Sequence, residues 1–367
     1  MKKIIDFIKK YIPKTAQAAF VTAALSALVL TLSVYITPFA DAVNSTVSTA
    51  FRVLMSVLSS PFPFSLFEVL VCLIPVALVL LFIYMFKKVR TRLSAVRFLF
   101  ATLAVPAFIF SGFVFALGVP YHTTGIAERM QISEVEVDSV SLEKTSLILR
   151  DEVNSLASEL SLSSEKASET ELSFSEISQL VTDAYGTFED EYGFPFNFYT
   201  RAKPMMFDEV MSSSHLLGIY TFFTGESNIN DGYPDYTVPF TVAHEFAHQR
   251  GIIREDEANF LAFAVCIRSS DPYVRYSGYL NMYEYTVSAL YKTDSQAFAR
   301  VHSKLSDAAF RDISASNEHS KKYRDSKLGE VVSSANDAYL QMNGTPGRVS
   351  YSLSVRLTVA YYEAFSE

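Results

Sequence analysis

Three long apolar runs in the first 120 residues most constrain what this chain can fold into. They cover about residues 17–40, 64–86 and 95–118. Each is long enough for a helix that crosses a bilayer, which needs roughly 20 apolar residues. Pro75 and Pro106 lie inside the runs, and spanning helices tolerate internal prolines better than soluble strands do. We therefore expect a membrane anchor of three transmembrane helices over residues 1–120. The first run alone resembles a signal peptide, but two further runs favour an uncleaved anchor.

Basic residues flank these runs unevenly. Five lysines precede the first run, and five Lys or Arg lie between the second and third, at residues 87–97. The 41–63 segment carries only Arg52 and is expected to be a short loop. The positive-inside rule then places the N-terminus in the cytoplasm. An odd number of spans makes residues 121–367 extracytoplasmic, so the expected location is the cell membrane, with a multi-pass topology.

The charge of the two parts excludes some functions. Residues 1–120 hold 11 Lys+Arg and 3 Asp+Glu, a net of +8, whereas residues 121–367 hold 20 and 36, a net of −16. An acidic second part argues against nucleic acid as a partner, because nucleic-acid binding needs a basic surface. The apolar runs contain almost no ionisable residue, Glu68 being the exception, which argues against a transporter.

Helical patterns dominate the second part. Residues 121–192 are acidic, and apolar spacing predicts helices over 142–160 and 174–191, an expected helical lead-in. Residues 193–367 are expected to form the functional domain. Aromatic and turn residues early in this domain predict one or two short strands, chiefly in the run at 218–224. The expected fold class is mainly α, with a zincin-like, α-rich extracytoplasmic domain and a short β region.

Residues 237–251 read TVPFTVAHEFAHQRG and have the signals of a short helix. Thr237 can cap its start, and Pro239 suits a first turn. Gly251 can end the helix in the left-handed conformation.

The chemistry in this helix comes from His244, Glu245 and His248. Two histidines four residues apart project from the same face, so their imidazoles can share one ion. Two imidazoles and a carboxylate hold zinc at three corners of a tetrahedron, and the fourth corner keeps a water. Glu245 is placed to accept a proton from that water as general base. The expected cofactor is one zinc ion.

The third ligand is expected from the next helix, EDEANFLAFAVC, at residues 255–266. Glu255 and Glu257 are the candidates. Glu257 is favoured, because the apolar residues that follow it would pack the helix pair and turn its carboxylate toward the histidines. A third histidine six residues after the second is excluded, since that position is Arg254. Asn259 can hydrogen-bond a ligand histidine from behind.

Other positions are weaker candidates for the site. The run at 218–224 is a candidate edge strand for an extended peptide, with Tyr220 in it. Asn228 and Asn230 follow and can hold a substrate backbone or simply form turns. Candidate donors to an oxyanion are His215, Tyr220, Tyr236, Arg250 and Tyr351.

These residues resemble known families. EANFLA after HEFAH is similar to the glutamate-ligand zinc peptidases, or gluzincins, which also favours Glu257 as third ligand. Nearly the whole chain resembles a bacterial membrane-protein family, domain-of-unknown-function family 3810. The segments that carry this resemblance are the three apolar runs, RAKP, GIYTFFTGESNIN, TVAHEFAHQRGI, EDEANFLA, NDAYLQMNG and a late SY. The resemblance implies a zinc-peptidase-like domain on the bacterial cell membrane.

The expected function is hydrolysis of peptide bonds by a membrane-anchored zinc metallopeptidase. Its partners would be the lipid bilayer and a peptide or protein substrate, associated with the membrane or the wall. The alternative is a catalytically silent, zinc-bearing receptor or scaffold at the cell surface. Glu245 distinguishes the two, because a site that only binds does not need a general base beside the metal.

Overall fold

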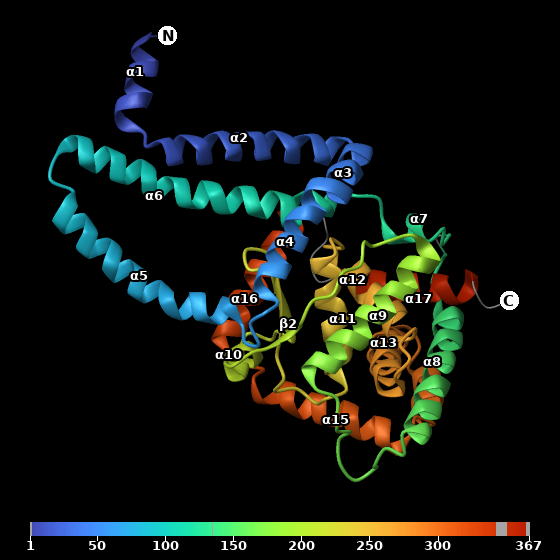
Figure 1. Cartoon of the computed structure of the whole chain (residues 1–367). Helices are drawn as coiled ribbons and strands as arrows, with labels where there is room; N and C mark the ends of the chain where they lie inside the picture. Colours follow the sequence, from blue (N-terminus) through green and yellow to red (C-terminus); the bar gives the residue numbers. More distant parts are fainter. Residues whose placement is uncertain (1, 134, 343–350, 365–367) are drawn as a thin grey trace. The chain divides into compact units, whose positions relative to one another are not determined.

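The computed structural model describes residues 2–133, 135–342 and 351–364, and the chain folds into two compact units. Unit 1 comprises Met1–Ser59, Leu66–Thr123 and Phe222–Gly225. Unit 2 comprises Ser60–Ser65, Thr124–Thr221 and Glu226–Glu367. Both units are mostly helical (Figure 1), as the sequence predicts.

The described residues of unit 1 are mostly helical, apart from the turn Phe222–Gly225 and short links between helices. The helices are α1 (Lys2–Tyr11), α2 (Lys14–Tyr35), α3 (Thr37–Val43), α4 (Thr49–Ser59), α5 (Leu66–Lys88) and α6 (Arg92–Phe113), with π-helical turns at Asn44–Ser48 and Val114–Gly118 and a 3-10 turn at Pro120–His122. Among the described residues, three stretches are long and apolar enough to cross a membrane: Lys14–Tyr35, Leu66–Lys88 and Arg92–His122. They overlap the three apolar runs of the sequence, although α2 ends at Tyr35, before the expected end of the first run at residue 40.

The 41–63 segment, expected to be a loop, is mostly helical. It contains the end of α3, a π-helical turn and all of α4. The prediction was wrong because this stretch carries no Gly or Pro between Pro38 and Pro61, so nothing in it interrupts a helix.

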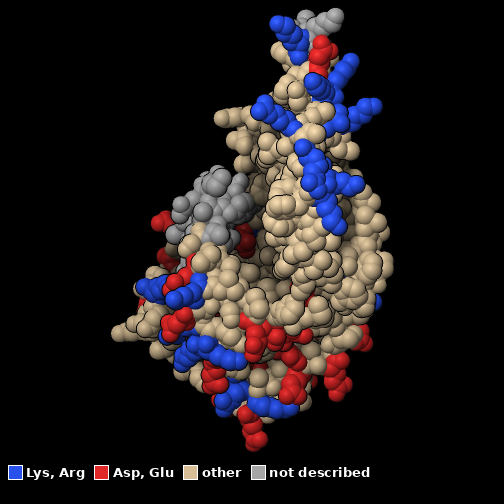
Figure 2. All heavy atoms as spheres, turned by 90° about the vertical axis from the view of Figure 1, so that its left-hand side faces the viewer, with Lys and Arg blue, Asp and Glu red and all other residues tan. Residues whose placement is uncertain are grey.

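The two basic clusters of unit 1 lie at one end of it. Helix α2 packs along α6, and the Nε of Arg97 in α6 donates a hydrogen bond to the carbonyl of Lys10 in α1 at 3.0 Å. The start of α6 is therefore tied to the end of α1. Figure 2 shows Lys and Arg side chains gathered toward that end of unit 1, beside a broad uncharged surface.

Unit 2 holds the remaining elements. Its helices are α7 (Ile126–Arg129), α8 (Ser139–Glu159), α9 (Phe174–Tyr192), α10 (Asp208–Ser213), α11 (Thr237–Gln249), α12 (Glu255–Cys266), α13 (Pro272–Thr293), α14 (Ser295–His302), α15 (Asp307–Lys322), α16 (Lys327–Met342) and α17 (Tyr351–Ala364). Its strands are β1 (Lys203–Pro204), β2 (Gly218–Thr221) and β3 (Glu226–Ile229), in the order β1-β3-β2. Strand β1 pairs with β3 in parallel, and β2 pairs with β3 antiparallel.

The helices α11 and α12 lie at the centre of the core of unit 2. They pack on each other and are covered by α9, α13 and α17, while α8 lies along α13. The expected lead-in helices are part of this same core, since Val153 of α8 and Tyr185 of α9 are fully buried in it. Their starts have the caps that sequence favours: the side chains of Asp138 and Ser173 each form a capping box.

Helix α13 approaches α12 closely at one glycine. A Cβ added at Gly278 would lie 2.5 Å from the Cβ of Cys266, a distance at which something must shift. Because Gly278 has no side chain, α12 can pack closely on α13.

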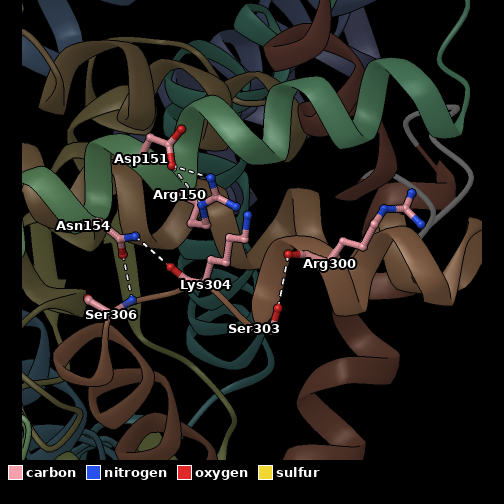
Figure 3. A network of polar contacts seen from close by, with 7 residues as sticks. All are labelled: Arg150, Asp151, Asn154, Arg300, Ser303, Lys304 and Ser306. Carbon is pink, nitrogen blue, oxygen red and sulfur yellow. Dashed lines mark hydrogen bonds and ion pairs between the residues drawn. The ribbon is translucent and has the colours of Figure 1, made fainter.

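Polar contacts fix the outer helices (Figure 3). Asn154 of α8 donates from Nδ2 to the carbonyl of Lys304 at 2.9 Å and accepts at Oδ1 from the backbone N–H of Ser306 at 2.7 Å. Ser306 in turn caps α15. One asparagine therefore joins α8 to the turn between α14 and α15.

A buried carboxyl group lies on α13 in the same core. Glu284 accepts a hydrogen bond from the hydroxyl of Tyr236 at 3.0 Å. Burial raises the pKa of Glu284 to about 7, the Tyr236 hydrogen bond opposes the rise, and the charge of Asp312 adds to it. Ionising Glu284 therefore costs free energy in the folded state.

We expect Glu284→Gln to lessen the loss of stability as pH rises. A carboxyl group whose pKa is higher in the folded state binds its proton more tightly there, so the free energy of unfolding falls as pH rises from its ordinary value of 4.5 to about 7. The full shift corresponds to at most about 3 kcal/mol. The unfolding midpoint of the full chain in detergent, followed by near-UV circular dichroism, should drop less between pH 5 and pH 8 in the variant. Exposed Glu318→Gln is the control, and an equal drop in all three proteins would contradict the assignment.

Candidate metal centre

The motif helix α11 places two imidazoles on one face. His244 and His248 are four residues apart, and their ring centroids lie 4.6 Å from each other. The helix starts at Thr237, but Tyr236 is its N-cap and makes no side-chain cap. The expectation that Thr237 caps the helix was wrong, because its hydroxyl donates instead to the carbonyl of Pro234.

A single carboxylate on α12 faces both imidazoles. The Nε2 of His244 lies 3.3 Å from Glu255 Oε2, and the Nε2 of His248 lies 3.7 Å from Glu255 Oε1. One ligand atom from each residue lies within 4.8 Å of the other two. Ligands about 2.0–2.1 Å from a tetrahedral zinc are about 3.3–3.4 Å apart, so these distances suit a shared ion. They are longer than the roughly 2.7–2.9 Å of a charge-assisted hydrogen bond.

Glu257, the favoured third ligand, does not face the histidines. Its Oε1 accepts from the backbone N–H of Ile126 at 3.0 Å and lies 2.7 Å from Nη2 of Arg254. The expected position was wrong for a geometric reason. Residues two apart on a helix point about 200° apart, so only one of Glu255 and Glu257 can face α11. The bounds of α12 are those expected, but the side of the helix that faces α11 is the one that carries Glu255.

A backbone carbonyl orients the imidazole of His248. The Nδ1 of His248 lies 2.9 Å from the carbonyl oxygen of Ile252. Because a carbonyl only accepts, the proton is on Nδ1, and the lone pair of Nε2 is free toward Glu255. Asn259 lies beside the ring of His244, where its side chain favours the protonated form. Nδ1 of His244 and Nδ2 of Asn259 nevertheless have no hydrogen-bond partner among the described residues, so the expected hydrogen bond from Asn259 to a ligand histidine stays a prediction.

The pKa values of the three groups follow from burial and mutual charge. Burial lowers the pKa of His248 below its usual value, and Glu255 opposes this only in part. Burial raises the pKa of Glu255, but the two histidines outweigh it and hold the carboxylate ionised. Burial lowers the pKa of His244, yet Glu255 raises it overall. Glu255 is thus the group that favours positive charge at His244, and a bound cation would take the place of a proton on that imidazole.

Glu245 lies beside this group and is almost fully buried. Its Oε2 has no hydrogen-bond partner among the described residues. Burial raises the pKa of Glu245 to about 7, His244 opposes the rise, and Glu255 adds to it. An unsatisfied buried oxygen is costly in a core, and such groups tend to have a catalytic or ligand-related reason.

Strand β2 touches the same carboxyl group. A Cβ added at Gly218 would lie 2.6 Å from Oε1 of Glu245 and 2.9 Å from Cγ2 of Thr241, and the backbone of Tyr220 hydrogen-bonds Glu245. β2 is an edge strand in the sheet of the described residues. The candidate edge at 218–224 is therefore at an edge, but the strand ends at Thr221.

The two asparagines after β2 have structural partners. Asn228 donates to the carbonyl of Ile219 and the hydroxyl of Thr221, which ties β3 to β2. Asn230 donates to Ser212 and accepts from the backbone of Gly232. The contacts of Asn230 are those of the turn-forming alternative, whereas Asn228 lies within β3 and fits neither expectation.

The other candidate oxyanion donors lie in other contacts. Tyr236 points to Glu284 in the core. Arg250 is buried against the ring of Tyr185 and binds Asn197. His215 contacts the carbonyl of Tyr323, and the side chain of Tyr351 lies outside the described residues.

Two contributors were missed by sequence reasoning. Gly218 is needed because the backbone of β2 passes so close to Glu245, and a glycine at a strand end is a known signal of such an approach. Ile252 contributes only its carbonyl, so no side-chain pattern could have revealed its role.

The chain belongs to the family described as "Protein of unknown function (DUF3810)", whose model matches residues 44–359. This range includes α11, α12 and the whole sheet. No curated protein and no solved structure matches the chain. The resemblance to this family is thus confirmed, and the description of the family carries no activity.

The geometry makes a test between the two glutamates possible. We expect Glu255→Gln to weaken zinc binding by more than about 100-fold, beyond what partners of ligands usually cost. Glu257→Gln keeps an acceptor for Ile126 and is the matched control, expected to stay within about tenfold of wild type. A chelator competition on the full chain in detergent measures both. The opposite ranking would restore Glu257 as ligand, and no zinc in wild type would remove the metal assignment.

Proposed function

We propose that this chain is a membrane-anchored, zinc-dependent peptidase in which His244, His248 and Glu255 hold the metal and Glu245 is the general base. One observation carries the proposal: two Nε2 atoms and one carboxylate meet at spacings that suit a four-coordinate ion. The donor set fits zinc, which takes imidazole nitrogen and carboxylate oxygen. Beside them, Oε2 of Glu245 has no hydrogen-bond partner among the described residues, so it can accept a hydrogen bond from a water.

The proposed reaction is hydrolysis of a peptide bond. Zinc, when bound, supplies a Lewis acid that activates water and polarises the substrate carbonyl. Glu245 accepts a proton from the water whose oxygen adds to the carbonyl carbon. It then delivers that proton to the amide nitrogen as the C–N bond breaks. The products are a carboxylic acid and an amine, and no other reactant is required.

Strand β2 supports a peptide as substrate. It is at the edge of the sheet, the position at which an extended chain can add as a further strand. The contact of Gly218 with Glu245 would bring a peptide paired with β2 next to the general base. Main-chain pairing of this kind binds many sequences, because it uses groups that every peptide has.

We further propose that the three apolar helices of unit 1 cross the bacterial cell membrane. Their length and hydropathy support this. The contact between Arg97 and Lys10 supports a common side for the two basic clusters, and the positive-inside rule makes that side cytoplasmic. Unit 2 is then extracytoplasmic, where membrane or wall proteins and peptides are within reach.

We expect Glu245→Gln to bind zinc like wild type but to lose cleavage. Removing a general base typically costs about 10²–10⁴-fold in rate, whereas the ligand atoms are unchanged. Zinc content and cleavage of a mixed peptide library would be measured on the full chain in detergent, with and without chelator. Equal cleavage by variant and wild type would exclude Glu245 as base. Zinc without any cleavage by wild type would favour the silent receptor or scaffold.

We expect Gly218→Ala to lower the cleavage rate while zinc stays bound. The added methyl group would displace the carboxyl group of Glu245, and a displacement of about 1 Å can cost about 100-fold in rate. Gly186→Ala is the matched control, because a Cβ there meets its nearest atom at an ordinary 3.4 Å. Unchanged kcat in Gly218→Ala would show that β2 does not set the position of the base.

A further inference from the structure

Unit 2 exposes large apolar side chains in three separate segments of the chain. The first is residues 62–64, with Phe62 and Phe64. This segment belongs to unit 2, yet only Ser65 separates it from Leu66, the first residue of α5. The chain therefore passes from these phenylalanines almost directly into one of the helices that can cross a membrane.

The second segment follows β1 and begins α10. It exposes Met206, Phe207 and Val210. The Nζ of Lys203 in β1 donates a hydrogen bond to the carbonyl of Phe62. This contact ties the second segment to the first.

The third segment is the start of α16, with Leu328 and Val331 exposed. Between them Gly329 packs on His215, whose ring carbon would be 2.5 Å from a Cβ at that position. Since α10 ends at Ser213, the start of α16 lies against the end of α10. Figure 1 shows these two helices side by side in unit 2.

These contacts link the three segments, and we name them together the interfacial face: residues 62–64, 206–210 and 328–331. The apolar side chains named in them are between 40% and 65% exposed. Clusters of exposed aromatic and aliphatic side chains are uncommon on soluble proteins and mark contact surfaces. Phenylalanine and aliphatic side chains of this kind suit the boundary between headgroups and acyl chains.

We propose that the interfacial face inserts into the surface layer of the bilayer that α5 crosses. The inference rests on the membrane anchoring of the proposed function. Chain continuity selects lipid over a protein partner, because the face leads into an apolar helix after one residue. The acidic residues of α10 do not oppose this strongly, since Asp208 and Glu209 both interact with Lys322.

The face bears on the class of substrate. Strand β2 begins at Gly218, soon after α10 ends at Ser213. An extended peptide paired with β2 would then be bound close to the membrane surface. Polypeptides tethered to the membrane are therefore the substrate class that this site favours.

Depth measurements on the full chain test the proposal. Single cysteines would be placed at Val210 in the face, at Leu78 in the middle of α5, and at Phe310 on α15, in a Cys72→Ser background that retains buried Cys266. Phe310 is the matched control, because it is as exposed as Val210, at 53%. Each protein carries an environment-sensitive fluorophore in phosphatidylcholine nanodiscs. Quenching is measured with nitroxide-labelled lipid and with aqueous iodide.

We expect the Val210 label to be quenched several-fold more by lipid nitroxide than the Phe310 label, and less by iodide. Leu78 should be quenched by lipid. If lipid nitroxide quenches the Leu78 label but the Val210 label behaves like the Phe310 label, the interfacial face is in water. The inference then fails, while the proposal that α5 crosses the membrane is supported. If the Val210 label is shielded from both quenchers, protein covers the face and the inference also fails. If Leu78 is quenched only by iodide, the anchor itself is wrong.

Discussion

The turn between α11 and α12 is the constraint on which the candidate centre depends. Gly251 has a φ of +92°, a left-handed conformation that glycine adopts without the strain of a Cβ. The N–H of Ile252 bonds to the carbonyl of Ala247, and the N–H of Gly251 to that of His248, which is the pattern of a Schellman motif. The same turn brings the carbonyl of Ile252 to Nδ1 of His248. Thus one local structure ends the first helix, sets where the second begins and orients an imidazole.

Burial of this helix pair gives the centre its electrostatic character. Four ionisable side chains meet where α11 faces α12: His244, Glu245, His248 and Glu255. Charged groups in such a place need partners, or they shift their pKa values toward neutrality. Glu255 finds partners in the histidines, but the second oxygen of Glu245 finds none among the described residues. A core built only for stability would have no reason to keep it there.

Much of the fold and the centre could be predicted from the sequence, because local patterns set them. Apolar length indicated the three long helices, and helical spacing with caps indicated α8, α9, α11 and α12. Features that depend on tertiary packing could not be predicted from local sequence patterns. Whether α8 and α9 join the core depends on packing with α13, and the end of β2 at Thr221 depends on Phe222 and Phe223 packing with unit 1. The bounds of α12 were predicted correctly. The choice between Glu255 and Glu257 depended on which side of that helix faces α11, and this depends on a tertiary contact of Glu257 with the backbone of Ile126.

The two glutamates divide their roles because of helix geometry. Their side chains project to different sides of α12, and each contacts a different group of residues. Glu255 meets the histidines, whereas Glu257 bonds the N–H of Ile126 and pairs with Arg254, which is the N-cap of α12. Gly125 packs against the same two side chains, since a Cβ added there would lie 3.1 Å from Oε1 of Glu257 and 3.3 Å from Nη2 of Arg254. The first turn of α12 is therefore held from behind by the segment that contains Ile126, and this fixes the direction in which Glu255 points. Glu257 is not a proposed ligand, but its contacts help to place the neighbouring Glu255 where it can bind the metal.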